Sequence, residues 1–176
     1  MTTNKITVTA NPTPNLRFGD WQTSCAIGRN GVISATKKRE GDGCTPLGLY
    51  PLRTGFAQPD KFPNWPDKTR FEFAQPTPTD IWDDDPQSPT YNQLISLDPS
   101  ILHNERLSRT DGAYDVIIPI GYNDAPPKPG RGSAIFIHVA TSNLRPTAGC
   151  IALPRAQIIP LIEQITPYTR IEILPD

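Results

Sequence analysis

The apolar positions of this chain fall in short alternating or continuous runs, separated by segments rich in proline and glycine. Lys5 to Ala10 and Thr169 to Leu174 alternate polar and apolar residues, which is the period of a strand with one buried face. Tyr114 to Tyr122 is mostly apolar and predicts a central strand, in which Pro119 indicates an edge position or a bulge. These patterns favour a protein built mainly from strands.

Similar runs predict the remaining elements. Further strands are expected at Leu16–Ile27 (one or two strands), Thr45–Leu52, Leu94–Leu97, Ala134–Val139 and Ile151–Leu153. Asn30–Gly31, between apolar runs, is a hairpin signal. Arg155 to Ile165 has near-helical spacing, with Pro160 expected close to the helix start. The proline-rich segment 56–92 predicts a long irregular insertion, of the kind that is usually functional or mobile. We therefore expect a mostly β sandwich or barrel with one short C-terminal helix and a long proline-rich loop.

Length and charge narrow the function classes. The 176 residues fit a single domain over 1–176 that is long enough to bury a core. A net charge of −1 gives no electrostatic reason to expect nucleic acid or an anionic membrane as a partner. No apolar stretch approaches the roughly 18 residues of a membrane span. The first ten residues also lack the apolar core of a secretory signal.

One histidine and one cysteine stand out as candidate chemistry. His138 is the single polar side chain of the strand Ala134–Val139, and Cys150 directly precedes the apolar run Ile151–Leu153. A thiol becomes a strong nucleophile when an adjacent imidazole takes its proton, and Gly149 allows a tight turn whose amides can face an oxyanion. A buried structural cysteine and a core histidine remain the alternative interpretation. The other histidine, His103, has nothing in the sequence to place it beside a thiol.

The sequence provides no case for a metal or an organic cofactor. Asp83, Asp84 and Asp85 are adjacent carboxylates, which do not converge on one ion in an extended chain, so a solvated loop is the better interpretation. Cys25 and Cys44 either form a disulfide or remain free, since three cysteines cannot all pair.

Several blocks of residues carry a resemblance to a known family. His138, followed by Thr147-Ala-Gly-Cys-Ile-Ala-Leu153, resembles the catalytic signature of the L,D-transpeptidase (YkuD-like) family, in which a His precedes a Ser/Thr-x-Gly-Cys element. Thr45-Pro-Leu-Gly-Leu-Tyr50 resembles the family's Thr-Pro-x-Gly-x-Phe/Tyr strand entry. Blocks that fit one subgroup lie at Lys38–Gly43, Trp82–Asn92, Asp111–Asp115, Gly121–Asn123 and Gly132–His138. The resemblance extends from about Leu16 to the C-terminus.

The resemblance implies a function and a set of site residues. Cys150 would be the nucleophile and His138 the general base of an acyl transfer on peptidoglycan stem peptides, with amides near Gly149 binding the oxyanion. It also implies substrate contacts from Thr147, Ser133, Tyr122 and Asn123, carbapenem-type inhibitors, no cofactor, and a place in the periplasm or cell envelope. If His138 activates the thiol, alkylation of Cys150 is expected to titrate well below pH 8.5.

Two departures from the family pattern affect substrate recognition. Ala148 and Ala152 stand where the family commonly has a His before the Gly and an Arg two residues after the Cys. A stem-peptide carboxylate suits a bidentate cation, and the nearest candidates are Arg131, which is favoured because glycines flank it, and Arg145.

Two other function classes stay open. A non-catalytic peptidoglycan-binding or structural domain with the same fold is mildly favoured by Ala152. A different thiol peptidase is the other class, although papain-type and NlpC-type enzymes place Cys before His, and sortases need an Arg soon after the Cys.

Overall fold

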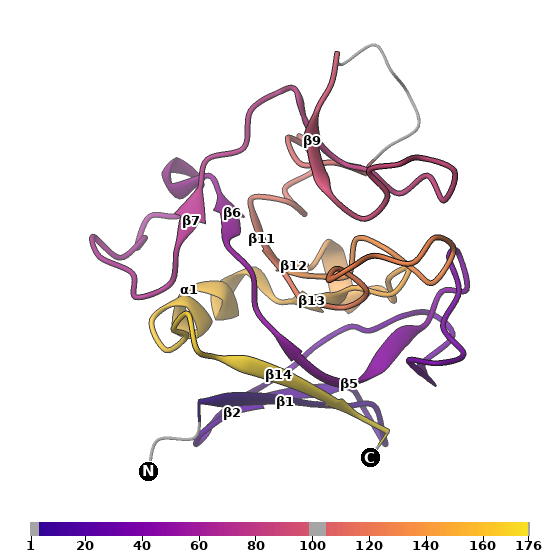
Figure 1. Ribbon diagram of the computed structural model, residues 1–176. Coiled ribbons are helices and arrows are strands. Elements are labelled where there is room, and N and C mark those ends of the chain that lie inside the picture. Colours follow the sequence, from indigo (N-terminus) through magenta and orange to yellow (C-terminus); the bar gives the residue numbers. More distant parts are fainter. Residues whose placement is uncertain (1–3, 99–104, 176) are drawn as a thin grey trace.

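The computed structural model describes residues 4–98 and 105–175, which form three β-sheets and one short α-helix. The mostly β architecture predicted from the alternating runs is confirmed. Figure 1 shows the sheets in layers, with the strands β1, β2, β5 and β14 in the lower layer, β11 to β13 in the middle and β9 above them. His138 lies on a strand of the middle layer, and Cys150 directly precedes another strand of the same layer.

The lower layer is a six-stranded sheet whose central strands come from the two ends of the chain. Its order is β3 (Trp21–Ser24), β2 (Asn15–Phe18), β1 (Lys5–Thr9), β14 (Arg170–Leu174), β5 (Thr45–Pro51) and β4 (Val32–Ser34). β1 and β14 are parallel, so that Ile6 pairs with Ile171 and Val8 with Ile173. These four side chains are almost fully buried, and each burial contributes roughly 1.5–3 kcal/mol to folding.

The prediction of a hairpin at Asn30–Gly31 is wrong. A turn forms there, with the Gly31 amide donating to the Gly28 carbonyl at 2.8 Å. The strand that follows, β4, pairs in parallel with β5 instead of folding back on the preceding segment. A two-residue hairpin loop joins antiparallel neighbours only. The segment before the turn pairs with the five-stranded sheet described below, where Ala26 forms a β-bridge with Ala152.

The middle layer is a five-stranded sheet with two differently covered faces. Its order is β13 (Ile151–Leu153), β12 (Phe136–Val139), β11 (Val116–Pro119), β6 (Gly55–Ala57) and β7 (Phe73–Ala74). Successive side chains of a strand point to opposite faces. Ile137 and Val139 therefore join the main core with the six-stranded sheet, whereas Phe136 joins a second cluster that contains Cys150. His138 shares this second face, because it is two residues from Phe136.

Of the two positions predicted for Pro119, the edge strand is wrong, whereas the pairing beside it is irregular: Ile117 pairs with Phe56, but Ile120 bridges Leu52, one residue out of register. β11 lies in the interior of the sheet, between β12 and β6. Pro119 is its last residue, and the pairing with β6 extends only over Val116 and Ile117. The missing proline N–H consequently interrupts no hydrogen bond to β6.

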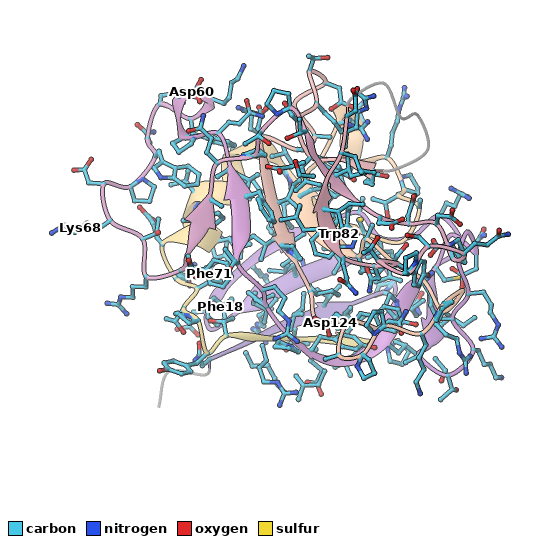
Figure 2. The ribbon with its side chains drawn as sticks, turned by 45° about the horizontal axis from the view of Figure 1, so that its top comes forward. Phe18, Asp60, Lys68, Phe71, Trp82 and Asp124 are labelled. Atoms are coloured by element: carbon cyan, nitrogen blue, oxygen red, sulfur yellow. The ribbon has the colours of Figure 1, made fainter. Side chains whose placement is uncertain are left out.

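The proline-rich segment is more ordered than predicted. Besides β6 and β7 it contains a 3-10 helix at Pro59–Lys61 and strand β8 (Asp80–Trp82), which forms a third sheet with β9 (Leu94–Ser96) and β10 (Glu105–Arg106). Its tryptophans pack inward: Trp65 meets Phe73 edge-on at 5.4 Å between ring centroids, and Trp82 meets Phe136 at 5.2 Å. Trp82 lies over the body of the molecule, whereas Asp60 and Lys68 point away from it (Figure 2). The segment thereby covers part of the outer face of the five-stranded sheet.

The helical segment near the C-terminus is short, as predicted. A 3-10 turn at Arg155–Gln157 leads into α1 (Ile158–Ile162), and Pro160 is the third residue of this helix. A proline in the first turn removes no intrahelical hydrogen bond. Ile158, Leu161 and Ile162 are buried in the main core.

Candidate active site

Cys150 and His138 line one pocket on the outer face of the five-stranded sheet. The pocket has a volume of about 450 Å³. β12 and β13 run in parallel, with His138 opposite Ala152 and Ile137 opposite Ile151. Cys150 precedes β13 by one residue, so its side chain and that of His138 emerge on the same face. The two strands are what place thiol and imidazole in one cavity.

A network of hydroxyl hydrogen bonds holds the turn that presents Cys150. The Thr147 hydroxyl accepts a hydrogen bond from the Gly149 amide at 3.0 Å and donates to the Cys150 carbonyl at 2.6 Å. The Thr45 hydroxyl, from β5, donates to the Gly149 carbonyl at 2.8 Å. The Gly149 amide, which the sequence suggested as an oxyanion donor, is therefore already engaged within the turn.

Glycine is required at position 149 for two reasons. Its φ of +147° is a backbone conformation that residues with a Cβ rarely adopt. A Cβ built there would lie 2.9 Å from the carbonyl oxygen of Cys44, which belongs to the backbone and cannot rotate away. The entry to β13 thus depends on this glycine.

The thiol of Cys150 is protonated and bound to the backbone. It donates to the Ala134 carbonyl at 3.1 Å and accepts a weak hydrogen bond from the Phe136 amide at 3.4 Å. The residue is only 9% exposed. Burial penalises the thiolate and raises the pKa of Cys150 to about 12, although the Phe136 amide opposes this shift.

The imidazole of His138 is neutral and has a defined tautomer. Its Nδ1 lies 2.8 Å from the Val139 carbonyl oxygen. A carbonyl can only accept, so Nδ1 carries the proton and Nε2 is left with its lone pair. Burial lowers the pKa of His138 below its ordinary value of 6.5, so the ring stays uncharged at neutral pH. A ring in this state can act as a base.

The thiol and the imidazole share the pocket without a hydrogen bond between them among the contacts of the described residues. The structure therefore does not support the expectation that His138 lowers the pKa of the resting thiol. The thiol proton points to Ala134, and the desolvated thiolate has no adjacent cationic imidazole to stabilise it. The resting site contains two neutral groups.

This geometry predicts an unusual pH dependence of alkylation. The rate at which iodoacetamide modifies Cys150 is expected to rise about tenfold per pH unit from pH 7 to beyond pH 10, because the thiolate fraction rises by that factor below the pKa. His138→Gln is expected to leave this profile unchanged. The measurement is mass spectrometry of the Cys150 peptide against pH, and a plateau below pH 8.5 in the unmodified protein would contradict the neutral resting thiol.

The wall beside His138 is a network that the sequence did not reveal. The Tyr114 ring meets the imidazole edge-on at 5.5 Å, and its hydroxyl donates to Glu105 at 2.7 Å. Arg109 lies over the Tyr114 ring at 4.8 Å and forms ion pairs with Glu105 and Asp111. The charge of Arg109 is thus compensated by two carboxylates. Glu105 lies on the two-residue strand β10 and Arg109 follows it, and no periodic pattern could have indicated either residue; Asp111 and Tyr114 belong to a block that resembles the family.

The loop at Lys38–Gly43, one of the blocks that carry the resemblance to the family, forms another wall of the pocket. Lys38 is 2% exposed and donates to Asp42 at 2.7 Å and to the Arg39 carbonyl at 2.9 Å. Glu40 accepts hydrogen bonds from the hydroxyls of Tyr91 and Ser133. Asp42 is therefore engaged with Lys38, whereas Glu40 faces the pocket.

Asp84 adds a second carboxylate to the pocket lining. Burial, reinforced by the nearby charge of Glu105, raises the pKa of Asp84 to about 6. Its neighbour Asp83 is buried and accepts hydrogen bonds from Ser88 and Thr90, so it closes a turn. The three aspartates thus have separate environments, and the described residues contain no group of His, Cys, Asp or Glu that could hold a metal ion.

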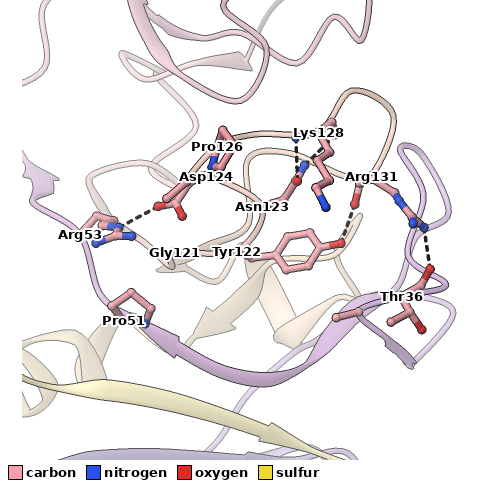
Figure 3. A pocket seen from close by; sticks show the side chains of 12 residues that line it. Thr36, Pro51, Arg53, Gly121, Tyr122, Asn123, Asp124, Pro126, Lys128 and Arg131 are labelled. Atoms are coloured by element: carbon pink, nitrogen blue, oxygen red, sulfur yellow. Dashed lines mark hydrogen bonds and ion pairs between the residues drawn. The ribbon is translucent and has the colours of Figure 1, made fainter.

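The structure divides the predicted substrate-binding residues between two pockets. Those that line the Cys150 pocket are Ser133, Thr147 and Arg145. Those that line a different cavity are Tyr122, Asn123 and Arg131 (Figure 3).

Arg131, which the sequence favoured as the carboxylate-binding cation, does not reach the thiol pocket. Its guanidinium donates to the Thr36 carbonyl at 2.6 Å. The flanking glycines do permit a turn there, but the turn directs the side chain to the other face of the loop.

Neither Cys25 nor Cys44 lines the pocket of Cys150. Cys25 and Cys44 are buried free thiols, so they do not form a disulfide in this structure. His103 lies outside the described residues. Among the described residues, no helix is long and apolar enough to cross a membrane.

The chain is similar to a solved structure and to a protein family. The crystal structure of the helical cell shape determining protein Pgp2 from Campylobacter jejuni aligns with 98% of this chain at 12% sequence identity and a TM-score of 0.48. The alignment covers 47% of that protein, so this chain spans about half its length. No curated protein matches the chain. The model of the YkuD family, described as the L,D-transpeptidase catalytic domain, matches residues 4–173. Because this match covers almost the whole sequence, including His138 and Cys150, the chain belongs to the YkuD family of L,D-transpeptidase catalytic domains.

Proposed function

We propose that this domain is a cysteine-dependent L,D-transpeptidase that acts on peptidoglycan stem peptides through a thioester acyl-enzyme. The observation that carries the proposal is the shared pocket of Cys150 and His138, in which a buried thiol and a neutral imidazole with an available Nε2 emerge on one sheet face. Membership of the family supports peptidoglycan as the substrate class and the cell envelope as the place of action. No cofactor takes part in the proposed reaction.

The first step transfers the acyl group to the enzyme. The thiol proton leaves the Ala134 carbonyl and moves to Nε2 of His138, and the thiolate attacks the carbonyl ahead of the terminal D-amino acid. The tetrahedral intermediate then collapses. The C–N bond breaks, the leaving amine takes the proton from His138, and a thioester on Cys150 remains.

The second step consumes the thioester. An amine approaches, loses a proton to Nε2 of His138 and forms a new amide as the C–S bond breaks. The thiolate of Cys150 then recovers that proton. A stem-peptide amine gives a cross-link and a free D-amino acid gives an exchanged terminus, whereas attack by water gives an L,D-carboxypeptidase.

We assign the backbone amide of Cys150 as the hydrogen-bond donor that stabilises the developing oxyanion. The Gly149 amide donates to Thr147 and cannot turn to the substrate without opening the turn. The Cys150 amide follows it at the entry of β13, beside the reacting sulfur. Backbone donors that are fixed before the reaction stabilise such charge without reorganisation.

Arg145 is the cation best suited to a substrate carboxylate. It lines the Cys150 pocket, is exposed, and has no ion-pair partner among the described residues, in contrast to Arg109 and Lys38. Arg145→Ala is therefore expected to lower kcat/KM by roughly tenfold to a hundredfold, mainly through KM, because one charge-assisted hydrogen bond is lost.

The control for Arg145 is Arg17→Ala. Arg17 is an exposed arginine on β2 in the other sheet, and its removal changes the net charge by the same amount. Steady-state kinetics on a disaccharide-tetrapeptide compare the two variants. Equal kinetics in both variants would show that Arg145 does not hold the substrate.

A second candidate function is a peptidoglycan-binding domain without catalysis. It is favoured by the raised pKa of the Cys150 thiol and by its hydrogen bond to Ala134 instead of His138. The two functions differ in covalent chemistry. Intact-mass measurement after incubation with a carbapenem or a tetrapeptide stem is expected to show one acyl group on Cys150 and none on Cys25 or Cys44. A protein that binds the stem and stays unmodified would be the binding domain.

A further inference from the structure

The cavity that contains Tyr122, Asn123 and Arg131 has features of a second ligand site. Its volume is about 490 Å³, within the range of sites for small organic molecules. The loop between β11 and β12 forms one side, and residues near the end of β5 form the other (Figure 3). The same loop separates it from the catalytic pocket, because Arg131 faces this cavity whereas Ser133 lines the pocket of Cys150.

The lining of this cavity carries an excess of positive charge. Arg53, Lys128 and Arg131 are its cations, and Asp124 is the carboxylate among the described lining residues. Asp124 is bound by Nε of Arg53 at 2.7 Å, which leaves the terminal nitrogens of that guanidinium for a ligand. Lys128 is exposed, and Figure 3 shows its side chain directed into the cavity. Two positive charges thus remain without a carboxylate in the lining.

The loop that presents these cations is held rigidly. Asn123 has a φ of +51°, and its amide group donates to the carbonyls of Lys128 and Gly132 at 3.0 and 2.9 Å. Its side-chain oxygen accepts from the Lys128 amide at 2.9 Å. The Tyr122 hydroxyl donates to the Arg131 carbonyl at 2.6 Å. Because the loop is bound through its backbone, the cationic side chains are not needed to fold it.

Gly121 and the apolar residues define the rest of the cavity. A Cβ on Gly121 would lie 2.6 Å from Pro51 and 3.0 Å from the guanidinium of Arg53, so glycine makes room for that arginine. Pro51 and Pro126 add apolar surface to the lining. The site thus combines cationic donors with an apolar wall, which suits an anion attached to a carbon skeleton.

We propose that this cavity binds a small organic oxyanion, a phosphate or carboxylate group on a body of several carbons, independently of the catalytic pocket. Arg53, Lys128 and Arg131 contact the anionic group, since guanidinium and ammonium groups are the usual partners of both anions. The apolar wall contacts the body. The proposal does not depend on whether Cys150 is catalytic.

The test is an NMR titration of the whole domain at low salt with four probes: glucose 6-phosphate, glucuronate, inorganic phosphate and glucose. At least one of the two anionic sugars is expected to shift the amides of residues 121–131, with an affinity that falls as salt is added. Glucose is expected not to bind, and phosphate alone is expected to bind more weakly than the phosphorylated sugar. The anionic sugar that binds with the higher affinity identifies whether the cavity prefers a phosphate or a carboxylate.

Lys128→Ala is the decisive variant. It is expected to weaken binding about tenfold or more, as for the loss of one charge-assisted hydrogen bond, while the spectrum of the free protein is retained outside the loop. Lys68→Ala removes the same charge from an exposed lysine that points away from the molecule (Figure 2) and is expected to leave the affinity unchanged. Equal weakening in both variants, equal binding of glucose, phosphate binding as tightly as the phosphorylated sugar, or shifts confined to the Cys150 pocket would each overturn the proposal.

Discussion

Cys150→Ala is expected to abolish turnover while the fold is retained. The variant has no nucleophile, so kcat/KM on a disaccharide-tetrapeptide should fall by at least about 10⁴-fold, as when the reacting group of a covalent catalyst is removed. The sulfur is buried and makes two weak backbone hydrogen bonds, so its loss should cost only about 1 kcal/mol of the free energy of unfolding. The measurements are steady-state kinetics and a thermal melt.

Cys25→Ala provides the matched control. Cys25 is also a buried free thiol, and burial raises its pKa to about 12, like that of Cys150. It belongs to the main core and does not line the Cys150 pocket, so its replacement should leave turnover unchanged. Retained activity in Cys150→Ala would remove the nucleophile assignment, and loss of activity in both variants would point to damage of the fold.

Gly149→Ala is expected to damage stability and activity together. Two costs add at this position: the positive φ, and the contact of the new Cβ with the Cys44 carbonyl at 2.9 Å. Together they should lower the free energy of unfolding by roughly 2–4 kcal/mol, which corresponds to about 5–15 °C in melting temperature for a domain of this size. Relief of the contact would shift the turn that holds Cys150, so kcat should also fall.

Gly19→Ala measures the cost of a positive φ without a contact, at a φ that residues with a Cβ adopt more readily than that of Gly149. Gly19 also has a positive φ, of +61°, but a Cβ there would meet no atom within 4 Å. That variant should lose only about 1 kcal/mol and retain full activity. Equal melting temperatures for the two variants would show that the contact with Cys44 is relieved at no cost and that the Cys150 turn is not constrained by it.

The strands of the fold were predictable because their signals are local. The alternation in Lys5–Ala10 and Thr169–Leu174 reflects one buried and one exposed face, and the period of two is set by the backbone itself. Their position side by side at the centre of one sheet was not predictable. Pairing between segments that are more than 160 residues apart in the sequence depends on the whole assembly and leaves no local pattern.

The same division holds for the candidate site. His138 and Cys150 could be found from the sequence, because a lone polar residue in an apolar strand and a glycine before a cysteine are local features. The tertiary structure decided the protonation and the hydrogen bonding of these two groups. Ala134 binds the thiol proton and Val139 defines the imidazole tautomer, and both are backbone carbonyls that no residue type encodes.

The contacts of charged residues on loops are the hardest to predict from the sequence. The direction of a long side chain on a loop depends on which acceptor lies nearest in space. The flanking glycines favoured Arg131 over Arg145 in the sequence, yet Arg131 donates to Thr36 beside a separate cavity and Arg145 lines the thiol pocket. Sequence thus determined which residues can carry the chemistry. The packing of the loops decided which of them meet, because it depends on contacts between segments that are distant in the chain.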